Sequence, residues 1–132
     1  KQWESFDERS EIGACFQGIP QNDVGLRTDI LDCCPKAAGM MMLIRSMAPD
    51  VVAVDEIGGD PDLEALRCVM NCGCRILATV HGTSMEDIRN KPGFCRFLEE
   101  DIFERYVILG NKAGPGTVLD ICDGRGRSLL CG

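Results

Sequence analysis

Val51-Val52-Ala53-Val54-Asp55-Glu56 is the stretch that decides the fold of this 132-residue chain. Its first four residues form a continuous apolar run rich in β-branched side chains, which is typical of a parallel-sheet strand buried on both faces. Two adjacent carboxylates follow at once, at the end of the strand where ligands bind in such sheets. The stretch therefore predicts a parallel α/β sheet with polar chemistry at its carboxyl edge.

One helix is predicted before this strand in the sequence and one after it. The first covers residues 36–48 and stops at Pro49. Its apolar face consists of Ala37, Met40, Met41, Ile44 and Met47. The second opens at Pro61, where a missing N–H costs nothing, and ends at Gly73, which suits a left-handed cap. Its buried stripe consists of Leu63, Leu66, Val69 and Met70.

The rest of the chain continues this alternation. Further strands are predicted at residues 3–6, 75–80, 106–109 and 117–122. The strand at 75–80 is expected to be buried, and residues 28–32 are expected to form a helical turn. The chain is therefore assigned to the α/β class, with a mainly parallel sheet flanked by helices. The C-terminal antiparallel hairpin is expected to add an edge to that sheet.

Composition excludes several classes of function. The chain has 14 Lys and Arg against 21 Asp and Glu, a formal net charge of -7. It has no Lys/Arg run, so nucleic-acid binding is disfavoured. The longest apolar run, residues 37–44, is far shorter than the roughly 20 residues that span a bilayer. The start lacks the apolar segment of a signal peptide, so we expect a cytoplasmic location. Because Lys1 is not a Met, the chain is expected to begin inside a longer protein, although processing would give the same start.

Nine cysteines are many for a chain of this length. The densest cluster contains Cys68, Cys72 and Cys74. One interpretation is a metal site, but the spacing is not that of a CxxC pair and no second pair follows. The other interpretation, which we prefer, is a set of small buried side chains and tolerated surface thiols in a reducing compartment. A Cys-rich metal-binding domain stays open as a rival that metal analysis can decide.

Polar residues follow three of the predicted strands, at 7–9, 55–56 and 79–82. Because the carboxyl ends of parallel strands meet at one edge, these clusters are expected to form a site. Asp55 and Glu56 after an apolar strand have the form of a Walker B element. Such carboxylates can hold Mg²⁺, directly or through water, and the second can polarise an attacking water. The alternative is a solvated strand end without a task, and the pattern alone leaves the two equally open.

Single residues near these strand ends are further candidates. His81 is the only histidine. A lone His is more often structural or solvent-facing, but its place after a strand suits a γ-phosphate sensor or a proton shuttle. Thr79 supplies a hydroxyl beside it. Arg9, Arg27 and Arg45 are candidate phosphate contacts, because guanidinium binds phosphate in a fixed fork. Surface charge is the alternative for each arginine.

The phosphate-binding loop itself is missing. A Walker A motif, G-x-x-x-x-G-K-[ST], cradles phosphates on its backbone N–H groups. Gly13 and Gly18 have the glycine spacing, but Ile19 and Pro20 follow in place of Lys and Ser or Thr. The chain therefore carries the motifs of a P-loop-type ATPase core that take part in hydrolysis. It lacks the P-loop together with the strand and helix that flank it. Alone, it is expected to be inactive.

In combination, these residues resemble the stage III sporulation protein AA family. The stretches that carry the resemblance are residues 7–12, 19–25, 27–29, 40–46, 49–58 and 79–82. The resemblance extends over nearly the whole chain, and the combination is more specific than any one motif. That family is similar to the ATPases of type II and type IV secretion and of pilus retraction. The resemblance therefore implies a RecA-like ATPase fold, of which residues 1–132 would be the C-terminal part of one domain.

The resemblance also implies roles for individual residues. It places Glu8 and Glu11 in an acidic box and His81 in a histidine box. It places Asp55 and Glu56 in Walker B, and because the secretion relatives usually have Gly-Glu there, Glu56 carries over better than Asp55. The catalytic candidates are thus Glu56, Glu8, Glu11 and His81. One departure is the strand at 3–6, which is more polar than expected for a central strand.

The biological expectations come from the resemblance as well. It implies a role in endospore formation beside a channel between mother cell and forespore, with ATP and Mg²⁺ as cofactors. The expected partners are like subunits in a ring, with a hexamer as one form, and membrane proteins of a sporulation channel complex. The expected place is the inner face of the mother-cell membrane, and the P-loop is expected just upstream of Lys1. The rival function is a non-hydrolysing assembly module that docks on membrane channel proteins.

Overall fold

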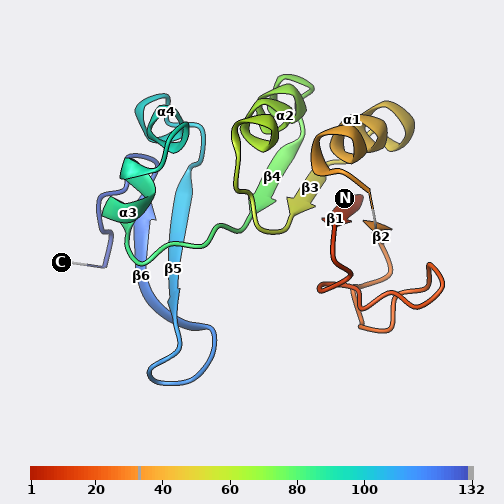
Figure 1. Ribbon diagram of the computed structural model, residues 1–132, viewed down its shortest axis with the longest axis horizontal. Helices are drawn as coiled ribbons and strands as arrows, with labels where there is room; N and C mark the ends of the chain where they lie inside the picture. The colour runs from red at the N-terminus through yellow and green to blue at the C-terminus, as the bar shows by residue number, and fades with distance from the viewer. Residues whose placement is uncertain (33, 131–132) are drawn as a thin grey trace. The chain divides into compact units, whose positions relative to one another are not determined.

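The computed structural model describes residues 1–32 and 34–130. They divide into two compact units, residues 1–81 and the residues from Gly82 onward. Figure 1 draws the first unit in red to green and the second in green to blue. Each unit is described by itself below. That both belong to one ATPase domain of a larger protein stays a prediction.

The first unit is built on a four-stranded parallel sheet. Its strands are β1 (Trp3–Asp7), β2 (Thr28–Asp32), β3 (Val51–Val54) and β4 (Arg75–Ala78). The spatial order is β2-β1-β3-β4, and every neighbouring pair is parallel. Helices α1 (Lys36–Met47) and α2 (Asp60–Asn71) lie side by side over one face of this sheet (Figure 1). The predicted α/β class and parallel sheet are confirmed.

The core of this unit lies between the sheet and the two helices. Phe6, Val52, Met40 and Leu66 are fully buried there. Gly39 lets α1 approach β1 closely, because a Cβ at this position would overlap the Phe6 ring. Apolar burial of this kind, at about 25 cal/mol per Å², is the main term that holds helix and strand together.

The helical turn predicted at residues 28–32 is wrong, because these residues form β2. They pair in parallel with β1 from Trp3↔Thr28 to Asp7↔Asp32. Ile30 lies against Gly13 and Leu31 lies against Gly39, so neighbouring side chains pack on opposite faces of the sheet. This pairing with a distant strand outweighs the local helical preference.

Two predictions of burial also need correction. The strand at 75–80 was expected to be buried, but β4 ends at Ala78 and forms the edge of the sheet, where Leu77 is 56% exposed. On α1, Met47 is exposed and Leu43 is buried in its place. Met47 is the last residue of the helix, whose buried residues are Gly39, Met40 and Leu43. The α2 stripe is confirmed at Leu63, Leu66 and Val69.

The second unit contains two short helices and a hairpin. The elements are α3 (Met85–Asn90), α4 (Phe94–Glu99), β5 (Arg105–Gly110) and β6 (Thr117–Asp123). Helix α3 is capped at its start, since the Ser84 hydroxyl accepts a hydrogen bond from the Asp87 N–H at 3.1 Å. The predicted antiparallel hairpin is confirmed.

The hairpin does not add an edge to the main sheet within the described residues. It forms a two-stranded sheet of its own. Phe97 stacks on Phe103 at 5.7 Å between ring centroids, and Phe103 meets Tyr106 edge-on at 5.9 Å. These aromatic contacts tie β5 to α4, which precedes it in the chain.

Candidate functional site

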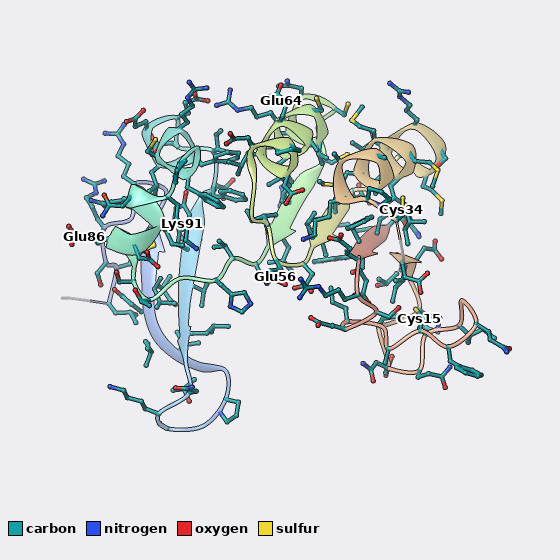
Figure 2. The ribbon with its side chains drawn as sticks, viewed as in Figure 1. Cys15, Cys34, Glu56, Glu64, Glu86 and Lys91 are labelled. Atoms are coloured by element: carbon teal, nitrogen blue, oxygen red, sulfur yellow. The ribbon has the colours of Figure 1, made fainter. Side chains whose placement is uncertain are left out.

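The four parallel strands of the first unit all end at one edge of the sheet. Polar groups follow three of them: Glu8 and Arg9 after β1, Asp55 and Glu56 after β3, and Thr79 after β4. Figure 2 labels Glu56 at this edge. The three polar clusters thus meet as predicted: hydrogen bonds join those after β3 and β4, and an ion pair joins Arg9 to Glu56.

Thr79 ties the ends of β3 and β4 together. Its hydroxyl donates to Asp55 Oδ1 at 2.9 Å and accepts from the Glu56 N–H at 2.8 Å. Its carbonyl accepts from the Ile57 N–H at 2.8 Å. One side chain thus fixes a carboxylate and the main chain of the next residue. Thr79 was predicted as a cofactor contact, and this positioning task was not foreseen.

The Glu56 carboxylate lies between an arginine and a histidine side chain. Arg9 Nη1 is 3.3 Å from Glu56 Oε2, and His81 Nε2 is 3.6 Å from Glu56 Oε1. Glu56 is 34% exposed, Arg9 66% and His81 87%. The three side chains come from the ends of three different strands and converge at a solvent-accessible place. Three of the predicted site residues are thereby brought together.

Lys36 completes the cluster and was not predicted. Its Nζ donates to the Glu56 carbonyl at 2.7 Å and lies 3.3 Å from Glu8 Oε2. The side chain is only 12% exposed. A sequence signal existed: Lys36 is the first residue of α1, where a cation opposes the helix dipole and is usually avoided.

Asp7 shapes the loop that carries the acidic-box candidates. Its buried carboxylate accepts hydrogen bonds from the backbone N–H groups of Glu11, Ile12 and Gly13, at 2.7, 2.9 and 2.8 Å. The loop therefore folds back over the end of β1. Asp7 holds Glu11 only through its backbone N–H, and Glu11 is exposed to solvent.

Two predicted phosphate contacts lie elsewhere. Arg27 precedes β2, and its carbonyl accepts from the Trp3 N–H, so it sits at the amino edge of the sheet. Arg45 is exposed in the last turn of α1, the end of the helix opposite Lys36. Neither is brought to Glu56, and of the three arginines only Arg9 is.

The central strand also carries a buried acid at its other end. Glu4 is fully buried, and its Oε2 has no hydrogen-bond partner among the described residues. Burial raises the pKa of Glu4, a hydrogen bond from Gln2 lowers it, and the nearby Asp29 charge raises it again. The strand predicted at 3–6 is more polar than expected for a central strand, yet β1 does lie in the interior of the sheet.

The cysteines show no metal site within residues 1–32 and 34–130. No group of three His, Cys, Asp or Glu residues in this part of the chain could hold a metal ion, and Cys68, Cys72 and Cys74 carry free thiols. Cys122 is buried, whereas Cys72 is exposed. Burial, followed by the charges of Cys72 and Asp50, raises the pKa of Cys74. Cys33 and Cys131 lie outside the described residues.

The oxygen donors at the carboxyl edge suit a magnesium site that substrate phosphates and waters would complete. Mg²⁺ is usually bound by one or two carboxylates together with substrate phosphates and waters. Asp55 and Glu56 supply the carboxylates, and Thr79 orients Asp55. With two carboxylates, these residues would hold such an ion together with phosphate oxygens and waters.

Comparison with known proteins assigns the chain to a family. A family model described as "Sporulation stage III, protein AA" matches residues 3–129. The chain is 48% identical over 123 residues to Stage III sporulation protein AA of Bacillus subtilis (strain 168). That alignment covers 93% of this chain and 40% of the relative, so the chain spans well under half of the relative's length. No solved structure matches. Among the described helices, none has the length and apolar character needed to cross a membrane.

Proposed function

The chain belongs to the stage III sporulation protein AA family, and we propose that it is the hydrolysis-side part of a RecA-like ATPase acting in endospore formation. The observation that carries the proposal is the convergence at one sheet edge. Glu56 lies 3.3 Å from Arg9 and 3.6 Å from His81, while Asp55 is bonded to Thr79. Open α/β sheets generally bind their ligands at such an edge. The complete protein, with its phosphate-binding loop, is the active species.

In this proposal Glu56 orients the water that attacks the γ-phosphate and accepts its proton. Asp55 is the magnesium ligand, held in place by the Thr79 hydroxyl. The ion, when bound, neutralises charge that develops on the phosphates. Phosphoryl transfer relies mainly on positioning and electrostatics, so a carboxylate held on rigid strand ends suits the task.

The pairing of Glu56 with Arg9 is weak enough to be exchanged. Both side chains are substantially exposed, and exposed ion pairs of this kind contribute about 0–1 kcal/mol. Arg9 can therefore leave Glu56 for a phosphate oxygen at small cost, which frees the carboxylate for water. His81, still more exposed, can turn to the γ-phosphate in the same way. Glu8, which lies 3.3 Å from Lys36, is a further acid near this place, and Glu11 follows it in the same loop.

The proposal includes partners and a place in the cell. The working form is a ring of like subunits, with a hexamer as one form, docked on membrane proteins of a sporulation channel complex. The protein works at the cytoplasmic, inner face of the mother-cell membrane. Nucleic acid is not among its proposed partners. These statements rest on the family and on its similarity to secretion ATPases. A Walker A motif before Lys1 in the longer protein is part of the proposal.

The test is Glu56→Gln in the full-length protein. Binding of Mg-ATP is expected to persist, while the rate of phosphate release falls by about 10²-fold or more, as for loss of a general base. Glu64→Gln is the matched control, since Glu64 is an exposed acid on α2, drawn away from Glu56 in Figure 2. A near-normal rate in Glu56→Gln would transfer the role to Glu8 or Glu11. No ATP turnover by the full-length wild type would favour the non-hydrolysing assembly module instead.

A further inference from the structure

Lys36 has contacts that the proposed chemistry leaves unexplained. Its Nζ is 2.7 Å from the Glu56 carbonyl and 3.3 Å from Glu8 Oε2. Its side chain is 12% exposed, far less than that of Arg9 at 66%. A lysine that only solubilises the surface would extend into water. Lys36 is instead turned inward between the ends of two strands.

The Glu56 main chain has an unusual conformation that Lys36 supports. Its φ is +48°, in the left-handed region that residues other than glycine seldom adopt. The Glu56 N–H is bonded to Thr79 Oγ1 at 2.8 Å, and its carbonyl is bonded to Lys36 Nζ. Both main-chain polar groups are therefore held by side chains. Without Lys36, the carbonyl would lose its partner and the residue could relax to an ordinary conformation.

Two other tasks for Lys36 fit the contacts less well. A phosphate ligand needs an ammonium group open to the ligand, but two protein oxygens already occupy this one. A purely structural link would join parts of the core, whereas Lys36 joins Glu56 to Glu8, two acids of the candidate site. The geometry favours control over the position of these acids.

We propose that Lys36 is a positioning residue that holds Glu56 in its left-handed conformation and keeps the Glu8 carboxylate beside it. Its ammonium group links the first turn of α1 to the main chain after β3 and to the side chain after β1. The Glu56 carboxylate then leaves the backbone in a fixed direction toward Arg9 and His81. The effect of Lys36 on turnover rests on the proposed ATPase function, whereas its effect on the Glu56 main chain does not.

The experiment compares Lys36→Met with wild type in the full-length protein by two measurements. Methionine keeps most of the length of the side chain and removes its charge and its donors. Hydrogen exchange in the peptide that contains Glu56 and Ile57 is expected to become about tenfold faster, because the main chain loses a restraint. The kcat for ATP is expected to fall about tenfold or more, with KM changed by less than about threefold, the pattern of a lost orientation in the transition state.

Double mutants and controls separate positioning from general damage. In the Glu56→Gln background, Lys36→Met is expected to add little further loss, because Lys36 acts through Glu56. Lys112→Met removes an exposed lysine from the β5–β6 turn and is expected to change neither measurement. If Lys36→Met does not fold, Lys36→Ala decides the question, and wild-type exchange at residues 56–57 together with wild-type kcat in that variant overturns the proposal.

The outcomes that overturn the proposal differ from those that overturn the ATPase function. Unchanged exchange at residues 56–57 in Lys36→Met overturns it. So does an about tenfold rise in KM with unchanged kcat, which would identify a phosphate ligand. A wild-type protein that turns over no ATP would sink the ATPase function alone, and the exchange measurement would still decide the role of Lys36.

Discussion

Replacing Asp7 by Asn perturbs the support beneath the candidate site without changing its shape. The buried Asp7 carboxylate accepts the N–H of Glu11 on Oδ1, and those of Ile12 and Gly13 on Oδ2. An Asn side chain has a single oxygen, which makes its best fit at the Oδ2 position. The amide nitrogen would then face the Glu11 N–H, so two donors would meet.

The size of the effect follows from these three bonds. A hydrogen bond to a charged acceptor contributes about 1.5–3 kcal/mol, and one such bond is lost. The two that remain lose their charge assistance and become weaker. Exposure of the neighbouring Glu11 lets water replace part of the loss. We therefore expect local destabilisation of about 2–4 kcal/mol, or about 30- to 1,000-fold in the opening equilibrium at 1.4 kcal/mol per tenfold.

Hydrogen exchange in the full-length protein measures this opening directly, in the peptide that contains residues 11–13. Asp23→Asn is the matched control in the same loop, because Asp23 makes one exposed bond, to the Gly25 N–H at 3.1 Å. The control is expected to change exchange at residues 11–13 by less than about threefold. Should Asp7→Asn accelerate exchange there no more than the control does, Asp7 would not be the support of the loop.

Two further predictions concern His81 and Glu4. His81→Ala in the full-length protein is expected to spare ADP binding and the melting temperature while ATP turnover falls, because the imidazole is 87% exposed and buries little surface. A lower melting temperature with an unchanged rate per folded molecule would make it a structural histidine. For Glu4, burial raises the pKa above the ordinary value of a glutamate, so the folded state holds the proton more tightly than the unfolded state. Stability is therefore lost as pH rises from the unfolded pKa to the folded one. The melting temperature of Glu4→Met minus that of wild type should be more positive at about pH 7 than at about pH 4, and a difference independent of pH would contradict the raised pKa.

Local signals explain which parts of the fold were predictable. The apolar run of β3 specifies a buried strand by itself, and Pro61 and Gly73 mark the two ends of α2, with Gly73 at φ +83°. β2 has no such signal, since five residues with two acids become a strand only by pairing with β1. The exposure of β4 likewise depends on the absence of a further neighbour in the described sheet, which its composition does not reveal.

The candidate site shows the same division. Asp55 and Glu56 could be found because they directly follow a recognisable strand. Arg27 and Arg45 look equivalent to Arg9 in the sequence, and only the tertiary fold separates the amino edge from the carboxyl edge. Lys36 escaped because its partners, Glu8 and the Glu56 carbonyl, are distant in sequence. Its position against the helix dipole was the one local sign.

The central position of β1 in the sheet has a consequence for the synthesis of the protein on the ribosome. Trp3 pairs with Thr28 on one side and with Val51 on the other, so both neighbours of this strand are translated after it. At about 5–20 residues per second, β1 waits for several seconds with both edges open to other nascent chains. A wholly apolar strand would aggregate readily during that interval. Glu4 and Asp7 keep the waiting segment charged and soluble, at the cost of burying two acids once its neighbours arrive.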